Sequence, residues 1–419
     1  MKIEILNILK ENLTVKISFI FISIFPVILL TGSSIVNTSI VIMNIIFLIH
    51  IFNKKKFKIF NNDFFYILFA LWIFFIINTL LNNDFESNYS RAFGFIRFIL
   101  FIFLFSYFLS YKNFKFKKTI FNIWTIIFII VSLDLVFEFI FGFNTFGFKS
   151  NYVGRLSGFM GDELKIGHWY LCFSLIALSN NYDQNKKFFF ILFFSIIVSF
   201  LIGERANFIR LFLAFILLMT ITRRLSFKSF GVLFIIIGGI FFIVNNAKIG
   251  NMLIIKGRYI DTFSSKLKHS SVKEFNNNDN PYTPMYFNAY NIFKDNKLLG
   301  VGLGSYLEKS HEKFRKVKFI NGYAISPNTH PHQYHFEILA VLGLPGYIFI
   351  FLFLLYFFYK SLRFYKKDKN PINLTSFLMV FVFSIPLLPT GSFFTTFGAS
   401  IFWLNFSLMN LGNFKNINH

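Results

Sequence analysis

Residues 328–346 read NTHPHQYHFEILAVLGLPG, and the apolar run that starts inside this stretch extends over residues 336–359. Three of the eight histidines of the chain lie at its polar beginning: His330, His332 and His335. A helix needs about 20 apolar residues to cross the hydrocarbon core of a bilayer. The stretch therefore predicts a membrane-spanning helix with histidines gathered at one end.

Similar apolar runs recur along the whole chain and decide its class. The 419 residues are 55% hydrophobic and include 68 phenylalanines, more apolar surface than a soluble domain can bury. We expect an all-α, polytopic integral membrane protein with about 12 transmembrane helices. The predicted spans are residues 17–32, 35–52, 64–82, 93–111, 119–141, 163–180, 188–203, 206–222, 229–245, 336–359, 373–389 and 393–411.

The loops between these spans indicate the orientation. With the N-terminus inside, the loops after even-numbered spans carry 18 Lys and Arg residues, whereas the short loops after odd-numbered spans carry 4. Positive charge accumulates in cytoplasmic loops, so both termini are predicted to be cytoplasmic. The same bias explains the net charge of +23 without a nucleic-acid partner. Residues 1–16 are too polar for a typical cleaved signal peptide, so the first span is expected to be permanent.

The span positions divide the chain into three parts. We expect residues 1–245 to hold the first nine spans, residues 246–335 to form one large external loop, and residues 336–419 to hold the last three spans. Within the loop, residues 285–300 have the apolar spacing of a helix. The single cysteine, Cys172, allows no intramolecular disulfide.

Ionisable residues inside the spans indicate a polar cavity that opens to the outer face. Such residues are costly in a membrane and mark functional sites or helix-packing pairs. Arginine presents a fork of donors that suits phosphate oxygens, so a basic pocket suggests an anionic lipid headgroup, a polyprenyl pyrophosphate or a small inorganic anion. The residues concerned are Arg97, Asp134, Glu138, Lys165, His168, Arg205 and Arg210.

The three histidines admit three interpretations. The positive end of the following helix favours a neutral ring for His332, and a neutral imidazole can accept a proton as a general base. The histidines could instead form a hydrogen-bonded polar entry, or could bind a metal ion together with Glu337. Further along, Pro345 predicts a kink because it cannot donate to the carbonyl of Val341.

One spacing in this stretch resembles a known motif. His332 and Gln333, nine further residues, and then Gly343 and Gly346 match the histidine motif of the bacterial O-antigen ligase family. The two glycines are also expected to let a neighbouring helix approach closely. Residues 291–306 resemble a segment of the large periplasmic loop of that family, and residues 154–167 and 203–211 resemble its arginine segments.

The resemblance covers most of the chain and implies a glycosyltransferase C-like membrane fold in the bacterial inner membrane. It implies a glycan transfer without metal or cofactor at the periplasmic face, in lipopolysaccharide biosynthesis. The donor would be a glycan on undecaprenyl pyrophosphate, and the acceptor would be lipid A–core or another glycan, among membrane lipids. His332 would be the catalytic base, Arg205, Arg155, Arg258 and Arg210 would bind the pyrophosphate, and His330, His335, Gln333, Gly343 and Gly346 would support the site.

Two rival functions stay open. An O-antigen polymerase of the same superfamily often carries arginine followed after ten residues by glycine, a spacing that none of the loop arginines of this chain shows. A transporter of an anionic solute would show charges continuing to the inner face or repeated halves, and neither is visible. Glu204, where the family often has serine before the arginine, is expected to weaken the pull of Arg205 on phosphate.

Overall fold

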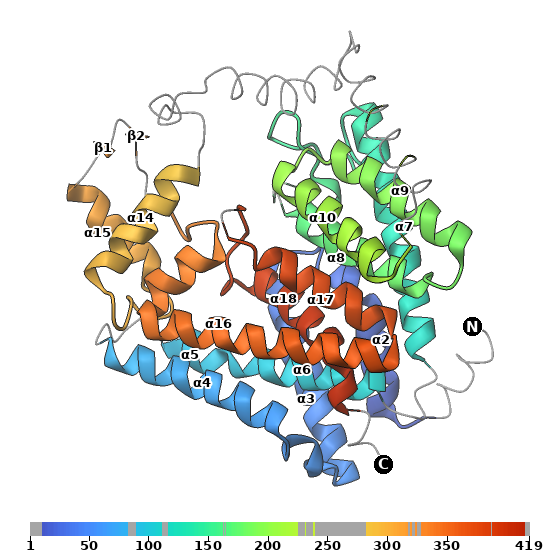
Figure 1. The fold of residues 1–419 in the computed structure, drawn as a ribbon, viewed down its shortest axis with the longest axis horizontal. Coiled ribbons are helices and arrows are strands. Elements are labelled where there is room, and N and C mark those ends of the chain that lie inside the picture. Colours follow the sequence, from blue (N-terminus) through green and yellow to red (C-terminus); the bar gives the residue numbers. More distant parts are fainter. Residues whose placement is uncertain are drawn as a thin grey trace. The chain divides into compact units, whose positions relative to one another are not determined.

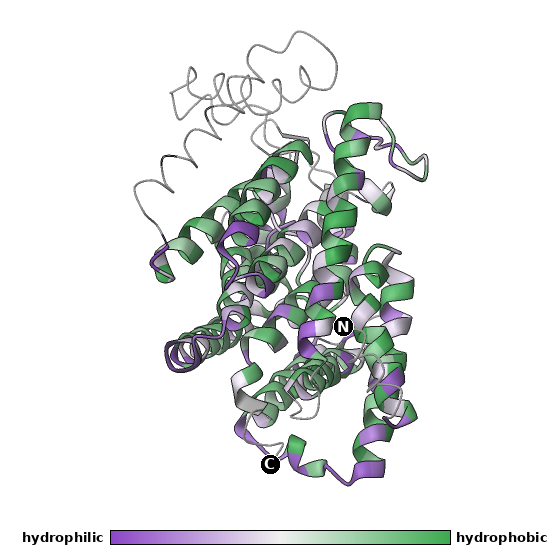
Figure 2. Ribbon diagram, turned by 90° about the vertical axis from the view of Figure 1, so that its right-hand side faces the viewer, coloured by the Kyte–Doolittle hydropathy of each residue, from purple (hydrophilic) through white to green (hydrophobic). Residues whose placement is uncertain are grey.

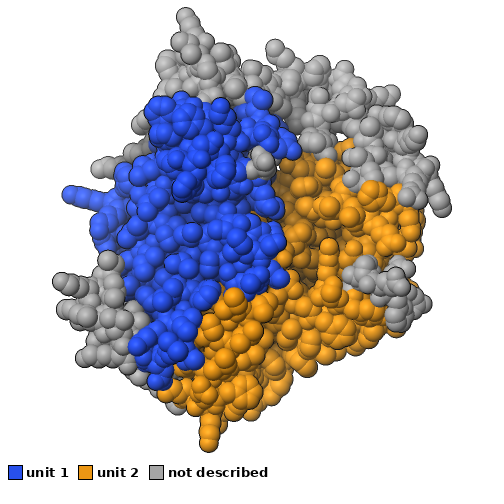
Figure 3. All heavy atoms as spheres, turned by 180° about the vertical axis from the view of Figure 1, so that it is seen from behind, with its two compact units in different colours: residues 1–39, 112–271, 365–382 blue, residues 40–111, 272–364, 383–419 orange. Residues whose placement is uncertain are grey.

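The computed structural model describes residues 11–82, 89–110, 116–161, 163, 165–224, 231, 238, 282–316, 319–320, 323–324, 328–386 and 388–414. The chain forms two compact units, coloured separately in Figure 3. Unit 1 comprises residues 1–39, 112–271 and 365–382, and unit 2 comprises residues 40–111, 272–364 and 383–419.

Helices dominate the described residues, as the sequence predicts, and Figure 1 labels most of them. Eleven of the twelve predicted spans contain helices in this part of the chain, and the ninth span, 229–245, lies almost wholly outside it. The helices that lie in these spans are α2 (Leu13–Ile28), α3 (Ser33–Lys54), α4 (Asp63–Leu81), α5 (Tyr89–Gly94), α6 (Ile96–Ser110), α7 (Lys117–Phe141), α8 (Ile166–Asn180), α9 (Asn185–Leu201), α10 (Arg205–Ile221), α16 (Tyr334–Asp368), α17 (Pro371–Phe383) and α18 (Thr396–Met409).

Five of these segments are long and apolar enough to cross a bilayer: α3, α4, the pair α5–α6, α7 and α16. Apolar residues cover most of the helical ribbon in Figure 2. This confirms a membrane protein with an all-helical framework. Several of the other helices are shorter than the roughly 20 residues of a full span, so the count of twelve spans stays a prediction.

The predicted external loop contains two further helices among its described residues. These are α14 (Tyr282–Asp295), which confirms the helical spacing predicted there, and α15 (Tyr306–Lys316). A two-residue antiparallel pairing of β1 (Phe319–Ile320) with β2 (Tyr323–Ala324) follows α15. The division of the chain into three topological parts stays a prediction.

In unit 1, helix α7 packs against α2, α8 and α9, and α10 packs against α8 and α9. Pro26 lies inside α2 and has no N–H, so the carbonyl of Ile22 lacks its usual helical donor. The indole of Trp124 on α7 donates to that carbonyl at 2.9 Å, and the indole of Trp169 on α8 donates to the carbonyl of Pro26 at 2.8 Å. Two buried tryptophans thereby fix α2 against α7 and α8.

In unit 2, the same chemistry shapes α16. Its backbone leaves helical geometry at Gly343, with φ +68° and ψ −172°, two residues before Pro345. Pro345 has no N–H to donate to the carbonyl of Val341. This carbonyl instead accepts the N–H of Gly302 at 2.9 Å. The predicted kink is confirmed, and the donor that replaces the helical bond comes from the loop between α14 and α15.

That loop, residues 296–304, is held to the bend by further backbone hydrogen bonds. The N–H of Val301 donates to the carbonyl of Ala340 at 2.9 Å, and the N–H of Leu344 donates to the carbonyl of Lys297 at 2.8 Å. The loop thus replaces a missing turn of helical hydrogen bonds on both sides of the bend. The loop and the bend of α16 therefore stabilise each other.

The two glycines of the motif, Gly343 and Gly346, allow close packing of different neighbours. A Cβ at Gly343 would overlap the carbonyl of Leu298, so the absence of a side chain here lets the loop pack closely. The expectation that a neighbouring helix approaches Gly343 is therefore wrong. A Cβ at Gly346 would lie 3.2 Å from the ring of Phe74 on α4, so the expectation of a close helix is confirmed there. The side chain of Asn78, also on α4, donates to the carbonyl of Leu299 at 2.7 Å and holds the loop from the other side.

The bend gives a test of this arrangement. We expect Gly343→Ala to lower the free energy of unfolding by at least about 3 kcal/mol, because it adds backbone strain and an overlap with the loop. Gly147 also has a positive φ of +82°, but a Cβ added there would have open space for 4 Å around it. Gly147→Ala should therefore cost only about 1 kcal/mol of strain. Unfolding of the detergent-solubilised protein measures both, and equal losses would mean that the close loop contact is unimportant.

Candidate functional site

His332 has a left-handed backbone, with φ +54°. The other non-glycine residues with positive φ in the described part of the chain are Lys55, Arg223 and Lys369, and each follows the end of a helix. A left-handed cap is ordinary at that position, whereas His332 precedes α16. The conformation costs a non-glycine residue about 1–2 kcal/mol, so neighbouring contacts must hold it.

Contacts from three segments hold His332. Its carbonyl accepts the N–H of Thr390 at 2.7 Å. Its ring centroid lies 5.8 Å from that of Tyr282 on α14, in an edge-on arrangement, and 4.2 Å from that of His330. The side chain stays partly exposed. Backbone and ring are therefore both positioned, while the ring keeps access to a ligand.

Glu337 holds the turn that follows His332. It lies in the first turn of α16 and is 4% exposed. One carboxylate oxygen accepts the hydroxyl of Ser392, and the other accepts the N–H of Phe393 at 2.6 Å. With the bond from Thr390, these contacts tie residues 388–395 to the entrance of α16. Sequence reasoning missed this role because nothing in the local spacing signals partners more than 50 residues away.

Tyr306, the first residue of α15, belongs to the same region. It is 4% exposed, and burial raises the pKa of its phenol. The negative charge of Glu337 raises that pKa further. The phenol therefore stays protonated at neutral pH, so Tyr306 acts as a hydroxyl and not as a proton acceptor.

His335, one of the predicted supporting residues, has both ring nitrogens engaged. Nε2–H donates to the carbonyl of Ser384 at 2.8 Å, and Nδ1 accepts the hydroxyl of Tyr347 at 2.9 Å. Because both ring nitrogens bond to protein groups, His335 presents no free nitrogen to a metal ion. This disfavours the metal interpretation, and it gives the ring of His335 a structural role that differs from the one expected of His332.

The remaining supporting residues lie at the same entrance. Gln333 is 1% exposed, and its side-chain oxygen accepts the N–H of Phe336 at 3.0 Å, which caps the start of α16. Nδ1 of His330 lies 2.9 Å from the hydroxyl of Thr329. The structure thus brings together His330, His332, Gln333 and His335, all in unit 2.

The predicted pyrophosphate-binding arginines that the structure describes lie in unit 1, whereas Arg97 lies in unit 2. Arg155 forms an ion pair with Glu204 at 2.9 Å between Nη2 and Oε1. The other oxygen of Glu204 accepts the amide of Asn207, and the carbonyl oxygen of that amide accepts Nη1 of Arg210 at 3.1 Å. Glu204, expected beside Arg205 as its partner, therefore holds Arg155. The spacing of three residues between Glu204 and Asn207 is the sequence feature that indicates this contact.

Glycines let the two arginine segments meet. A Cβ at Gly203, where φ is +77°, would overlap the carbonyl of Gly154. The N–H of Leu156 donates to the carbonyl of Ile202 at 3.0 Å. A Cβ at Gly167 would overlap the carboxylate of Glu204. The segments that resemble the arginine motifs are thus packed together, although about 50 residues separate them in the chain.

The four predicted pyrophosphate ligands differ in accessibility. Arg155 has 19% of its side chain exposed, and Arg205 is exposed at the first residue of α10. Arg210 is fully buried, an arrangement that suits the orientation of Asn207 better than direct contact with a bulky ligand. Arg258 lies outside the described residues.

Two carboxylates of α7 hold the loop that carries Arg155. Glu138 accepts the N–H of Ser157 at 3.0 Å and the N–H of Gly158 at 2.7 Å. Asp134 accepts the N–H of Thr145 at 2.9 Å. These acids lie on one face of α7, as their spacing of four predicts, and their oxygens serve the loop rather than the arginines.

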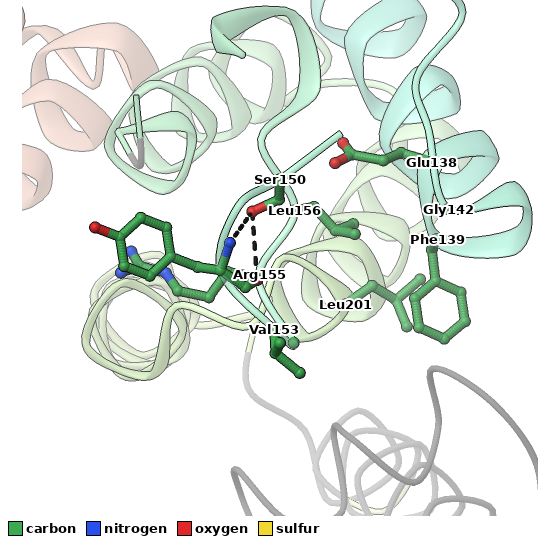
Figure 4. Close-up of a pocket in the computed structure, with 10 residues that line it drawn as sticks. Glu138, Phe139, Gly142, Ser150, Val153, Arg155, Leu156 and Leu201 are labelled. Atoms are coloured by element: carbon green, nitrogen blue, oxygen red, sulfur yellow. Dashed lines mark hydrogen bonds between the residues drawn. The ribbon is translucent and has the colours of Figure 1, made fainter. Parts of the chain in front are cut away.

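A cavity of about 180 Å³ adjoins this loop (Figure 4). In its lining, the hydroxyl of Ser150 forms hydrogen bonds with the backbone of Tyr152. The lining combines apolar side chains with one cation and one carboxylate, and it consists of Glu138, Phe139, Gly142, Ser150, Tyr152, Val153, Gly154, Arg155, Leu156 and Leu201.

The Arg155–Glu204 pair can be tested against an exposed pair. We expect Glu204→Ala to lower the free energy of unfolding by roughly 1–3 kcal/mol, because it leaves Arg155 and Asn207 without their buried acceptor. Glu163 pairs with Lys165 at 2.7 Å, and both side chains are about 40% exposed. Glu163→Ala should change stability by less than about 0.5 kcal/mol. Thermal unfolding in detergent compares the two, and equal effects would show that Glu204 is not a structural centre.

Comparison with known families agrees with this geometry. Residues 190–351 match the family model described as O-antigen ligase. The match confirms the resemblance predicted from the sequence, and it includes the 203–205 turn, α14, the loop of residues 296–304 and the motif from His332 to Gly346. The chain matches no curated protein sequence.

Proposed function

On the strength of the O-antigen ligase match, we propose that this chain is a ligase-type membrane glycosyltransferase. It transfers a glycan from undecaprenyl pyrophosphate to a sugar hydroxyl of lipid A–core or a similar acceptor. The observation that carries the proposal is the state of His332: a strained backbone held by Thr390, and a positioned, partly exposed ring. Strain of this kind concentrates at functional sites.

The proposed reaction involves one proton transfer and the departure of one leaving group. A ring nitrogen of His332 takes the proton of the acceptor hydroxyl, and the hydroxyl oxygen attacks the anomeric carbon of the donor. The bond from that carbon to the pyrophosphate oxygen breaks, and its electron pair leaves with undecaprenyl pyrophosphate. The imidazolium then gives its proton to water. A pyrophosphate is a good leaving group, so one base and charge stabilisation suffice.

The arginines supply the charge stabilisation. Arg155 and Arg205 bind the pyrophosphate oxygens, because their guanidinium groups are the accessible ones of the described set. Arg210 acts through Asn207, and Arg258 takes part from the external loop. No metal ion or other cofactor takes part.

The proposed setting is the inner membrane of a bacterium. In this proposal the chain has twelve spans, both termini in the cytoplasm and a periplasmic loop of residues 246–335, and the histidine entrance faces the periplasm. The charge bias of the loops supports this orientation. The donor and the acceptor are both membrane-anchored, which suits a site at the entrance of a membrane helix.

An O-antigen polymerase is the alternative, because the matched family belongs to a superfamily that holds both activities. A polymerase would use the same donor and the same base, with a second lipid-linked glycan as the acceptor. The absence of an arginine–glycine spacing of the polymerase type favours the ligase. An anion transporter would leave the positioned histidine without a role.

His332→Asn tests the base most cleanly. Asparagine tolerates the left-handed backbone, so the variant should fold, whereas it cannot accept the proton. In a host that lacks its own ligase, we expect glycan on lipid A–core to fall at least 100-fold with His332→Asn. The control His335→Asn should lower the protein level in the membrane more than the activity per molecule, because His335 bonds on both sides to protein groups.

Glycan-stained gels, normalised to protein in the membrane, decide between the outcomes. Glycan attachment by His332→Asn at the wild-type level would refute the base assignment. Lengthened lipid-linked chains with no glycan on lipid A–core would favour the polymerase. Movement of an anionic solute by a wild type that transfers no glycan would favour a transporter.

A further inference from the structure

Aromatic rings gather beside His332. Tyr282 and Tyr286 lie four residues apart on α14, and therefore on one helical face, with nearly parallel rings 6.3 Å apart. The ring of Tyr286 stacks on that of Phe336, in the first turn of α16, at 5.1 Å and 18°. The ring of Tyr282 contacts His332 edge-on. We call Tyr282, Tyr286 and Phe336 the aromatic platform; all three side chains are partly exposed.

The platform rings differ in exposure from the core aromatic residues of unit 2. Buried aromatic residues elsewhere in unit 2, such as Trp403 and Phe406, are 0% exposed and fill the space between helices. The platform rings keep part of their surface open while they stand next to the candidate base. Partly open aromatic faces beside a few polar groups are typical of small-ligand sites.

Two amides near His332 add polar groups to this region. Nε2 of Gln333 is buried and has no hydrogen-bond partner among the described residues, although the residue is only 1% exposed. The side-chain amide of Asn328 is likewise buried, with neither its nitrogen nor its oxygen paired within the described part of the chain. Its backbone N–H donates to Ser310, which also accepts the amide of Asn288 on α14.

Unpaired buried amides cost stability, roughly 1–3 kcal/mol each, unless a ligand or water completes them. An amide offers two donors and one acceptor, which match the hydroxyl groups of a sugar. A pyranose ring also presents an apolar face of C–H groups, which stacks on the negative face of an aromatic ring. A lipid chain would cover the rings and would leave the amides unpaired.

We propose that the aromatic platform and the amides of Gln333 and Asn328 form a binding site for the acceptor sugar ring. The ring stacks on Tyr282 and Tyr286, and the amides bond to its hydroxyls. One hydroxyl of the same ring then faces His332. This inference rests on the proposed transferase activity, and it names the residues that select the acceptor.

Steady-state kinetics of the full-length protein in proteoliposomes tests the site. With the lipid-linked donor saturating, Tyr282→Ala and Tyr286→Ala should each raise the KM for lipid A–core roughly 2- to 10-fold. For Tyr286→Ala, kcat and the KM for the donor should stay within about 2-fold of wild type, because the described ring contacts of Tyr286 are with Tyr282 and Phe336. Tyr282→Ala should also lower kcat, because the ring of Tyr282 contacts that of His332. Tyr286→Phe should restore the acceptor KM, because it keeps the aromatic face.

Tyr290 supplies the matched control. It lies one turn further along α14, is 49% exposed, and packs against Phe293 rather than against the entrance of α16. Tyr290→Ala should leave the acceptor KM unchanged. An equal rise in Tyr290→Ala and Tyr286→Ala, an unchanged acceptor KM in both platform variants, or a rise in the donor KM instead would each overturn the proposal.

Binding without turnover separates this inference from the proposed function. Core oligosaccharide is titrated calorimetrically into the His332→Asn protein in detergent, with no donor present. Adding Tyr282→Ala to the His332→Asn protein should raise the Kd for core oligosaccharide by the same factor by which Tyr282→Ala raises the acceptor KM. Transfer by wild type with unchanged oligosaccharide affinity in the platform variants would refute the acceptor site alone. Oligosaccharide binding that depends on Tyr282, together with no transfer by wild type, would refute the transferase and retain the site.

Discussion

Pairing of backbone carbonyls inside an apolar chain is the constraint on which both units depend. A carbonyl without a partner is costly where no water can serve it, and a proline removes the donor that a helix would supply. Pro26 frees the carbonyl of Ile22 and Pro345 frees that of Val341. In each case a distant segment supplies the donor, so the proline determines where that segment packs.

The second of these pairings places the candidate active site. The loop of residues 296–304 enters the bend of α16, and it carries α14 and α15 on its two sides. α14 in turn brings Tyr282 against His332. The histidine motif therefore combines two tasks within one stretch: its glycine end receives the loop, and its histidine end receives the helix that the loop positions.

Buried carboxylates of the described residues are used for positioning. Glu337 holds the segment that carries Thr390, Glu204 holds Arg155, and Glu138 holds the loop around Ser157. Each accepts backbone or side-chain donors that would otherwise lie unpaired in an apolar setting. The proposed base His332 and the proposed pyrophosphate ligand Arg205 are not among the buried residues, and Arg155 keeps 19% of its side chain exposed.

The sequence by itself determined the class, the approximate positions of the helices, the kink at Pro345 and the resemblance to the O-antigen ligase family, because apolar runs, proline geometry and motif spacing are local. It also selected His332 by its distance from Gly343. Only the tertiary structure decided that Glu204 serves Arg155, that a loop and not a helix approaches Gly343, and that Glu337 and Tyr282 hold the entrance of α16. Those partners lie about 40 to 60 residues apart in the chain, and hydrogen bonds between such distant residues leave no periodic signal in a sequence.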